Sequence, residues 1–275
     1  MSVFVIAEGA SAWWNGPDES EDVRLERMRQ LVDAAARAGA DAFKIQVFRA
    51  DRMYPMGTDH WSMLKKLEVP YDWLPKISVW CELAGIEFMA SCFDEESVDA
   101  ADPWMKRWKI ASLEITDLSL LRVVARKGKP IVLSTGAATR EQWLTAWTVL
   151  QPCAVTLMHC TVAYPCDPDQ VNVGALRRLR WQTARIGLSD HTLDPVVAPV
   201  MAVALGATVI EKHFTLSRQL VGPDHIYALE PAELKQMVSA VRLAERMLGD
   251  GLKHITPSEL QWVKWQHKDG GVRGG

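Results

Sequence analysis

Short apolar runs with β-strand character recur eight times along the chain, and segments with helical spacing of apolar residues separate them. The runs cover residues 3–7, 42–47, 87–91, 109–112, 131–134, 155–159, 186–189 and 208–212. The helical segments between and after them include residues 23–38, 71–84, 118–127, 140–150, 173–181, 195–205 and 231–248. Such near-continuous apolar runs are typical of strands buried on both faces of a parallel sheet.

Eight alternations of strand and helix with short connections leave few arrangements, of which a closed (β/α)8 TIM barrel of the α/β class is the simplest. An open doubly wound sheet is the alternative, but no GxGxxG motif opens the first helix. A length of 275 residues is normal for one barrel. We therefore predict a catalytic barrel domain over residues 1–250, followed by 251–275 with one extra helix at 257–266 and a glycine-rich tail.

Composition and charge exclude several classes of function. The chain is 48% hydrophobic and 24% charged, which is the balance of a soluble globular protein. The net charge is -3 and no block of Lys or Arg suggests a nucleic-acid partner. No apolar run approaches the ~20 residues of a membrane span, and residues 1–7 do not resemble a signal peptide. Five cysteines without a paired CxxC favour reduced thiols, and hence a cytoplasmic location.

Polar and ionisable residues stand at or just after the end of every predicted strand. They are Glu8; Lys44 and Gln46; Ser91 and Asp94; Lys109, Ser112 and Glu114; Ser134 and Thr135; His159, Thr161 and Tyr164; Ser189, Asp190 and His191; and Glu211, Lys212 and His213. One such residue alone usually caps a turn. In a barrel, however, the carboxyl ends of all the strands meet at one face, where catalysis takes place. The sequence therefore predicts an active site at that face.

Two lysines, Lys44 and Lys109, lie inside apolar strands, where an ammonium group is unfavourable unless it is paired or reaches an anion. On different strands they could bracket a phosphate and a carboxylate. The alternative is a buried ion pair with Glu8 or Glu114. The turn after the fifth strand, residues 134–136, carries hydroxyl and backbone N–H groups that suit phosphate, although Ser-Thr-Gly alone is a weak signal.

Two histidines, His191 and His213, end the last two predicted strands, which are neighbours in a barrel, so both rings should face its mouth. Either histidine alone is more typical of a hydrogen-bonded strand end. As a pair, with Asp190, Glu211 and Asp224 nearby, they favour a site for a divalent cation such as Mn, Co, Zn or Fe.

Six motifs follow one another along the chain at the predicted strand ends. They are KIASLE at 109–114, PIVLSTG at 130–136, HCT at 159–161 with Tyr164-Pro165, GLSDHT at 187–192, IEKHFT at 210–215 and GPDH at 222–225. In kind and in order they resemble the motifs of the N-acetylneuraminate (sialic acid) synthase family. The resemblance extends from about residue 5 to residue 249.

The resemblance implies an enzyme that condenses phosphoenolpyruvate with an N-acetylated hexosamine such as N-acetylmannosamine, giving a nine-carbon 2-keto acid sugar and phosphate. Carried over by motif, the residues that hold phosphoenolpyruvate are Lys44, Lys109, Ser112, Ser134 and Ser189. Those that contact the sugar are Glu8, Tyr164, Glu211 and Asp224. Thr161 is a further substrate-binding residue, and Gln46 and Ser91 are weaker assignments. The resemblance assigns the divalent cation, Mn or Mg in the family with Co or Zn as further options, to His191 and His213.

This chemistry suits the residue types. The enol carbon is a weak nucleophile, so a metal that polarises the sugar aldehyde as a Lewis acid would help it to react. Lysines neutralise the phosphate and carboxylate of phosphoenolpyruvate. Water must then attack the phosphate-bearing carbon, and Glu114 is the candidate that positions or deprotonates it, with Glu8 and Lys109 as further catalytic candidates. The alternative for Glu114 is a salt bridge to Lys109.

The chain departs from the family pattern mainly on the sugar side. The family usually continues into a small antifreeze-like domain that covers the partner's site in a dimer, and we expect this lid to be missing. Trp13-Trp14-Asn15-Gly16 stands where the family has Asn-His-Asn-Gly, so two indoles could stack on a sugar or simply pack. A legionaminic- or pseudaminic-type precursor is therefore also an expected acceptor.

Two other interpretations stay open. A related phosphoenolpyruvate-dependent synthase or an aldolase would make a shorter keto acid sugar. A lidless sugar-phosphate binding protein, or a subunit that needs a lid-supplying partner chain, would bind without turnover, and a homodimer is equally open. Fold alone does not decide among them, because barrels host many functions.

Overall fold

All eight predicted strands form in the structure, a computed structural model that describes residues 2–263, 265 and 266. They are β1 (Phe4–Ala10), β2 (Ala42–Val47), β3 (Glu87–Cys92), β4 (Trp108–Ile110), β5 (Ile131–Ser134), β6 (Val155–Cys160), β7 (Ile186–Asp190) and β8 (Val209–His213). Each strand pairs in parallel with the next, and β8 pairs with β1, so the sheet is a closed barrel. The prediction of a (β/α)8 barrel is confirmed.

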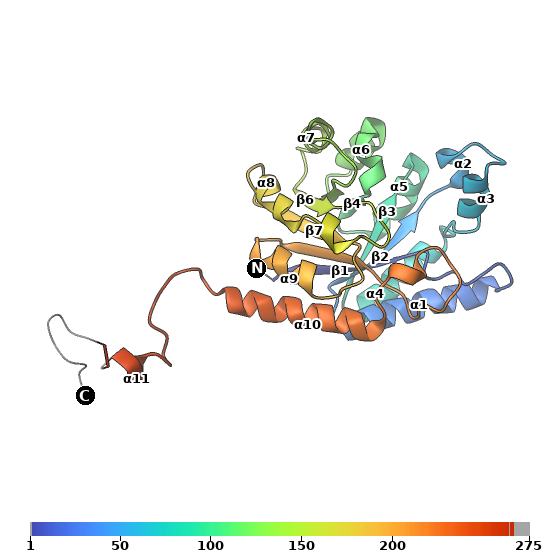
Figure 1. Ribbon diagram of the computed structural model, residues 1–275. Coiled ribbons are helices and arrows are strands. Elements are labelled where there is room, and N and C mark those ends of the chain that lie inside the picture. The colour runs from blue at the N-terminus through green and yellow to red at the C-terminus, as the bar shows by residue number, and fades with distance from the viewer. Residues whose placement is uncertain (1, 264, 267–275) are drawn as a thin grey trace.

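Helices surround this barrel (Figure 1). They are α1 (Glu21–Ala38), α2 (Ala50–Met53), α3 (Asp59–Lys65), α4 (Trp73–Leu83), α5 (Glu95–Ala101), α6 (Leu118–Arg126), α7 (Arg140–Val149), α8 (Leu176–Arg180), α9 (Val197–Ala204), α10 (Pro231–Leu248) and α11 (Leu260–Val263). Single 3-10 turns are η1 (Asp102–Trp104), η2 (Ser112–Thr116), η3 (Pro168–Gln170), η4 (Val173–Ala175) and η5 (His225–Tyr227). None of the helices described is long and apolar enough to cross a membrane.

Local sequence sets the helix ends. The side chain of Ser20 accepts a hydrogen bond from Val23 N at the start of α1, and Gly39 ends the helix with a φ of 89°, which glycine adopts without strain. At the start of α7, Thr139 and Gln142 form a reciprocal capping box. Beyond α10, the helix predicted at 257–266 is confined to Leu260–Val263, and Figure 1 shows this segment projecting away from the barrel. The predicted glycine-rich tail lies outside the described residues.

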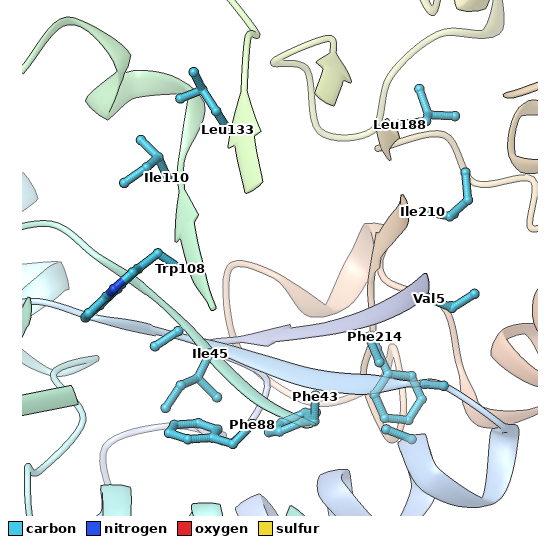
Figure 2. Packing of buried hydrophobic residues seen from close by; sticks show 14 of the residues in the cluster. Val5, Phe43, Ile45, Phe88, Trp108, Ile110, Leu133, Leu188, Ile210 and Phe214 are labelled. Carbon is cyan, nitrogen blue, oxygen red and sulfur yellow. The ribbon is translucent and has the colours of Figure 1, made fainter. Parts of the chain in front are cut away.

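Side chains alternate between the two faces of the barrel wall, as strand geometry requires. Those that point outward form the main hydrophobic core against the helices, and Figure 2 shows Phe43, Ile45, Trp108, Leu133 and Ile210 among them. Burial of each such side chain contributes about 1.5–3 kcal/mol to stability.

The interior of the barrel changes character along the strands. Its amino-terminal part is filled by a second apolar cluster of Ile6, Ala42, Met89, Val132, Met158 and Val209. Two residues further along the same strands, the inward positions are polar or ionisable, as at Glu8, Lys44, Ser91, Ser134 and Glu211. The apolar layer therefore forms the floor beneath a polar cavity at the carboxyl ends of the strands.

Candidate active site

A cavity at the carboxyl ends of the strands brings together most of the predicted site residues. Its lining includes Glu8, Lys44, Gln46, Ser91, Lys109, Ser112, Ser134, Tyr164, Ser189, His191, Glu211 and His213. These residues come from all eight strands or the turns that follow them. Residues far apart in the chain therefore meet in one place because the barrel aligns the carboxyl ends of its strands.

Two lysines and two carboxylates form a buried ionic network across this cavity. Lys44 Nζ contacts Glu8 Oε2 and lies 3.8 Å from Glu211 Oε2, while Lys109 Nζ lies 3.3 Å from Glu211 Oε1. Lys44 also donates a 3.0 Å hydrogen bond to Ser91 Oγ. Lys44 therefore forms the buried ion pair with Glu8 that the sequence left open as an alternative. Lys109 pairs instead with Glu211 on β8.

Burial in this network shifts the pKa of its members. Burial lowers the pKa of Lys44 to about 7, despite the opposing effect of Glu211, and the nearby ammonium of Lys109 lowers it further. Burial alone would raise the pKa of Glu211, but Lys109 and Lys44 outweigh it and hold this pKa at about 2. The carboxylate on β8 therefore stays ionised between two lysines.

Three serines line the cavity together with the lysines: Ser112 after β4, Ser134 on β5 and Ser189 on β7. Ser134 Oγ is buried and has no hydrogen-bond partner among the described residues. Ser112 Oγ accepts a 3.2 Å hydrogen bond from Gly136 N, and a Cβ on Gly136 would come within 2.7 Å of that oxygen. Ser189 Oγ donates to Glu211 Oε1 at 3.1 Å. An unpaired buried hydroxyl is unfavourable, so the cavity offers hydrogen bonds that an anion could accept.

The two histidines at the ends of β7 and β8 face each other, with ring centroids 5.5 Å apart and planes inclined by 63°. His191 Nδ1 is bonded to the carbonyl oxygen of Thr161 at 2.7 Å, which fixes the ring and leaves Nε2 for the cavity. His213 Nδ1 is buried without a hydrogen-bond partner in the described chain. Burial lowers the pKa of both rings, for His213 to about 3, so both imidazoles are neutral.

This donor set fits a catalytic metal site better than a structural one. Neutral imidazoles are the form that binds a divalent cation, and each ring keeps a nitrogen that forms no hydrogen bond with the part of the chain that the structure describes. The described residues contain no group of three or more His, Cys, Asp or Glu side chains arranged to hold a metal ion. Two protein ligands would leave coordination positions open for water and substrate.

Glu114 lies outside the cavity lining, on η2 two residues beyond Ser112. The predicted alternative, a salt bridge to Lys109, is not among the ion pairs of the described chain. Burial raises the pKa of Glu114 to about 7, and the neighbouring carboxylate of Asp117 raises it further. Glu114 is therefore a carboxyl group that can take up and release a proton near neutral pH.

Thr161 and Asp224 also lie outside the cavity lining. The carbonyl of Thr161 accepts from His191, while its hydroxyl donates to Gln170 O at 3.2 Å. Asp224 accepts hydrogen bonds from Ser11 N at 2.9 Å, from Ser11 Oγ and from the hydroxyl of Tyr227. Its carboxylate thus ties the segment after β1 to η5, at the side of the mouth next to His213.

Sequence reasoning missed Cys160, whose side chain lines the cavity and whose Sγ accepts a 3.4 Å hydrogen bond from Ser112 Oγ. It also placed Asp190 beside the two histidines, whereas this carboxylate points out of the barrel and binds Lys212. The alternation of side chains along a strand would have given both positions, since Cys160 lies two residues from inward Met158 and Asp190 lies one residue from inward His191.

Two further hollows lie close to the strand ends. One of about 150 Å³ adjoins the cavity through Gln46, which lines both, and has an apolar wall that includes Phe48, Met63 and Leu64. A larger one of about 650 Å³ lies between α7 and α8 and contains Trp143 and Trp181. The narrower cavity between the strand ends is the candidate active site, because it holds the convergent ionisable groups.

The fold and this cavity define a (β/α)8-barrel enzyme with a charged site at its strand ends. Residues 31–253 match the model of the NeuB family, and the chain belongs to that family. It is thus a sialic acid synthase-type enzyme, which confirms the resemblance in its motifs.

Similar proteins agree with this membership. The chain is 37% identical to the spore coat polysaccharide biosynthesis protein SpsE of Bacillus subtilis, covering 94% of this chain and 72% of that protein. It is 36% identical to the N,N'-diacetyllegionaminic acid synthase of Legionella pneumophila, with 94% and 77% covered. The crystal structure of N-acetylneuraminic acid (sialic acid) synthetase from Leptospira borgpetersenii in complex with citrate matches with a TM-score of 0.88 at 27% identity, covering 96% and 91% of the two chains.

Proposed function

We propose that this enzyme condenses phosphoenolpyruvate with the open-chain aldehyde of an N-acylated hexosamine, in the presence of a divalent cation, to give a sialic-acid-like 2-keto acid sugar and phosphate. The observation that supports this most directly is the convergence of two lysines, several serines and two histidines on one cavity. Cationic and hydroxyl groups suit the phosphate and carboxylate, while the imidazole pair suits the cation.

Phosphoenolpyruvate would bind between Lys44 and Lys109, with Ser112, Ser134 and Ser189 around its phosphate and carboxylate. Without substrate, Glu8 and Glu211 neutralise the two ammonium groups. An incoming anion would compete with these carboxylates for the lysines, and the unpaired hydroxyl of Ser134 would gain a hydrogen-bond acceptor. In a site with little water, such fixed charges stabilise anions more strongly than they would in solution.

His191 and His213 would hold the divalent cation, Mn or Mg being our first expectation. When bound, this cation would polarise the aldehyde oxygen of the acceptor as a Lewis acid. The residues of this chain orient the ligands, since the carbonyl of Thr161 fixes the ring of His191. Tyr164, whose ring centroid lies 4.2 Å from that of His191, closes the same side of the mouth and would contact the sugar.

The acceptor would extend from the cavity past Gln46 into the adjoining hollow of about 150 Å³. The described residues that line this hollow include no Lys or Arg, and they do include the carboxylate of Asp224. A phosphate group on the acceptor would therefore face a negative charge without a compensating cation. The apolar wall with Phe48, Met63 and Leu64 suits an acyl or deoxy substituent instead, so we propose an unphosphorylated N-acyl sugar.

The bond changes define what the protein must supply. The carbon–carbon bond forms between C3 of phosphoenolpyruvate and the aldehyde carbon, and positive charge develops at C2. Water then adds to C2. One of its protons passes through a base to the former aldehyde oxygen, which becomes a hydroxyl, and the other leaves with the phosphate when the bond between C2 and the phosphate oxygen breaks. Glu114, with its pKa raised to about 7 and its place two residues beyond Ser112, is the base that we propose.

The test is phosphate release by the purified enzyme with phosphoenolpyruvate, Mn²⁺ and a panel of aldoses that includes N-acetylmannosamine, its 6-phosphate and 2,4-diacetamido-trideoxyhexoses. Release with an unphosphorylated N-acyl sugar and its loss in S134A support the proposal, with the surface variant H60A as control. No release across the panel, with phosphoenolpyruvate bound in calorimetry, would instead identify a binding protein.

One observation favours a second candidate, a Schiff-base aldolase. The pKa of Lys44 near 7 would give a nucleophilic amine at neutral pH. Borohydride treatment with a keto acid sugar followed by intact-mass measurement separates the two, because only the aldolase acquires a covalent adduct at Lys44.

A further inference from the structure

A buried ion pair lies behind the two histidines, on the opposite side of the barrel wall from the cavity. Lys212 on β8 binds Asp190 on β7 with a distance of 2.5 Å between Nζ and Oδ2, and their side chains are only 1% and 0% exposed. The two residues are direct partners in the strand pairing. Each is adjacent in sequence to one of the two histidines, because His191 follows Asp190 and His213 follows Lys212.

A buried ion pair does not by itself stabilise a fold, since the free-energy cost of desolvating two charges can exceed the gain from their mutual attraction. Well-packed apolar residues in such a position are often as stabilising or more so. The neighbouring outward positions on the same two strands, Leu188 and Ile210, are apolar, so the fold itself does not require charge on this side of the wall. What distinguishes the position of Lys212 and Asp190 is its closeness to the ends of β7 and β8.

The ion pair is part of a clamp that surrounds the backbone of His191. Asp190 Oδ1 accepts a 2.9 Å hydrogen bond from Thr192 N. Lys212 Nζ donates to the carbonyl oxygen of Thr192 at 2.6 Å and to its hydroxyl at 3.1 Å. The residues on both sides of His191 are therefore tied to the lysine that immediately precedes His213, which couples the positions of the two rings.

Other contacts hold the ring of His191 from the opposite direction. Its Nδ1 is bonded to the carbonyl of Thr161, and its own carbonyl accepts a 2.8 Å hydrogen bond from Cys166 N. The imidazole is thus fixed by its ring and by its backbone. The Nδ1 of His213 has no hydrogen-bond partner in the described chain, and its ring packs against other rings, with centroids 5.6 Å from Tyr164 and 5.1 Å from Tyr227 among them. Without a hydrogen bond to Nδ1, the position of His213 depends more strongly on the backbone of β8, which the clamp holds.

We infer that Lys212 and Asp190 are positioning residues that set the separation of the two imidazoles and thereby the affinity for the divalent cation. This inference rests on the proposed function, in which His191 and His213 hold that cation. Neither Lys212 nor Asp190 belongs to the lining of the cavity. Partners that orient metal ligands in this way typically change metal affinity 10–100-fold when they are replaced, so we expect about that loss here.

The test compares the wild type with the double variant K212M/D190N. The double variant removes both charges together, so no single charge is left buried, and the carbonyl oxygen of the new side-chain amide can still accept from Thr192 N. The matched control is E87Q/R107M, which removes the ion pair of Arg107 with Glu87, 2.7 Å apart, between β3 and β4 at the amino ends of the strands. Mn²⁺ affinity is measured without substrate from the EPR signal of the free ion.

We expect K212M/D190N to stay folded, with a thermal midpoint no lower than that of the control, and to bind Mn²⁺ about 10–100-fold more weakly. Equal Mn²⁺ affinity in a folded double variant overturns the inference, because a purely structural pair would change the midpoint alone.

Failure of the proposed function gives a different result, namely that the wild type and H213A bind Mn²⁺ equally or not at all. Nitrogen NMR of the histidine rings then decides the positioning role without metal. Loss of the single His191 tautomer in K212M/D190N supports positioning of the ring, and an unchanged spectrum overturns it.

Discussion

Replacement of Glu114 by glutamine measures how strongly burial acts on this carboxyl group. Its pKa in the folded protein is about 7, compared with an ordinary value of 4.5. Between these two pH values the folded state binds more protons than the unfolded state, so the free energy of unfolding falls as the pH rises through this window. Above pH 7 the wild type carries a half-buried carboxylate that glutamine does not have. E114Q should therefore be more stable than the wild type at pH 8 and nearly equal to it at pH 5.

The size of the effect follows from the same pKa. The span from 4.5 to about 7 corresponds to roughly 3 kcal/mol at about 1.4 kcal/mol per pH unit. Because solvent reaches part of the side chain, screening reduces this to about 1–2 kcal/mol. For a chain of this length that is a rise of about 2–6 °C in the thermal midpoint.

Thermal unfolding of the wild type and E114Q at pH 5 and pH 8 is the assay, with the exposed Glu82 replaced in E82Q as control. A gain at pH 8 that is equally large at pH 5 would refute the reasoning, because it would not depend on ionisation. If Glu114 is also the base, phosphate release by E114Q falls by about 10²–10⁴-fold, and the wild-type rate rises with pH through about 7.

Three further predictions concern the cavity and its floor. K109M should weaken phosphoenolpyruvate binding at least about 10-fold in calorimetry, since it removes a buried cation; unchanged affinity would place the anion elsewhere. H213A should weaken Mn²⁺ binding at least about 100-fold by EPR, and chelation by EDTA should stop phosphate release, whereas full activity in EDTA would exclude the proposed cation. G187A should lower the free energy of unfolding, measured in urea, by about 1–3 kcal/mol, because a Cβ on Gly187 would lie 2.3 Å from Met158 Sδ and 2.6 Å from the carbonyl oxygen of Val209. An unchanged midpoint would mean that the strands of the barrel shift to accommodate the methyl group.

The sequence predicted the barrel well because buried parallel strands leave a clear pattern of apolar runs. Apolar runs located all eight strands, and most of the predicted site residues line one cavity because inward positions alternate along each strand. The α3 helix (Asp59–Lys65) was missed for a physical reason: none of its residues is buried, so it carries no clear apolar period. Glu114 lies on a turn beyond its strand, where alternation no longer tells in which direction a side chain points. The clamp of Lys212 and Asp190 was overlooked because both residues were grouped with the other polar residues at the strand ends. The alternation of side chains along β7 and β8 places these two on the outer side of the barrel wall.

The pairing of β8 with β1 closes the barrel, and this closure affects how the protein is made. A ribosome releases the strand with Glu8 long before it releases the strand with His213. In the nascent chain β1 therefore has a free edge that can join strands of other molecules. The barrel, and the binding site with it, can close only after the strand with His213 has emerged, so until then the unpaired edge of β1 is exposed to aggregation unless chaperones cover it.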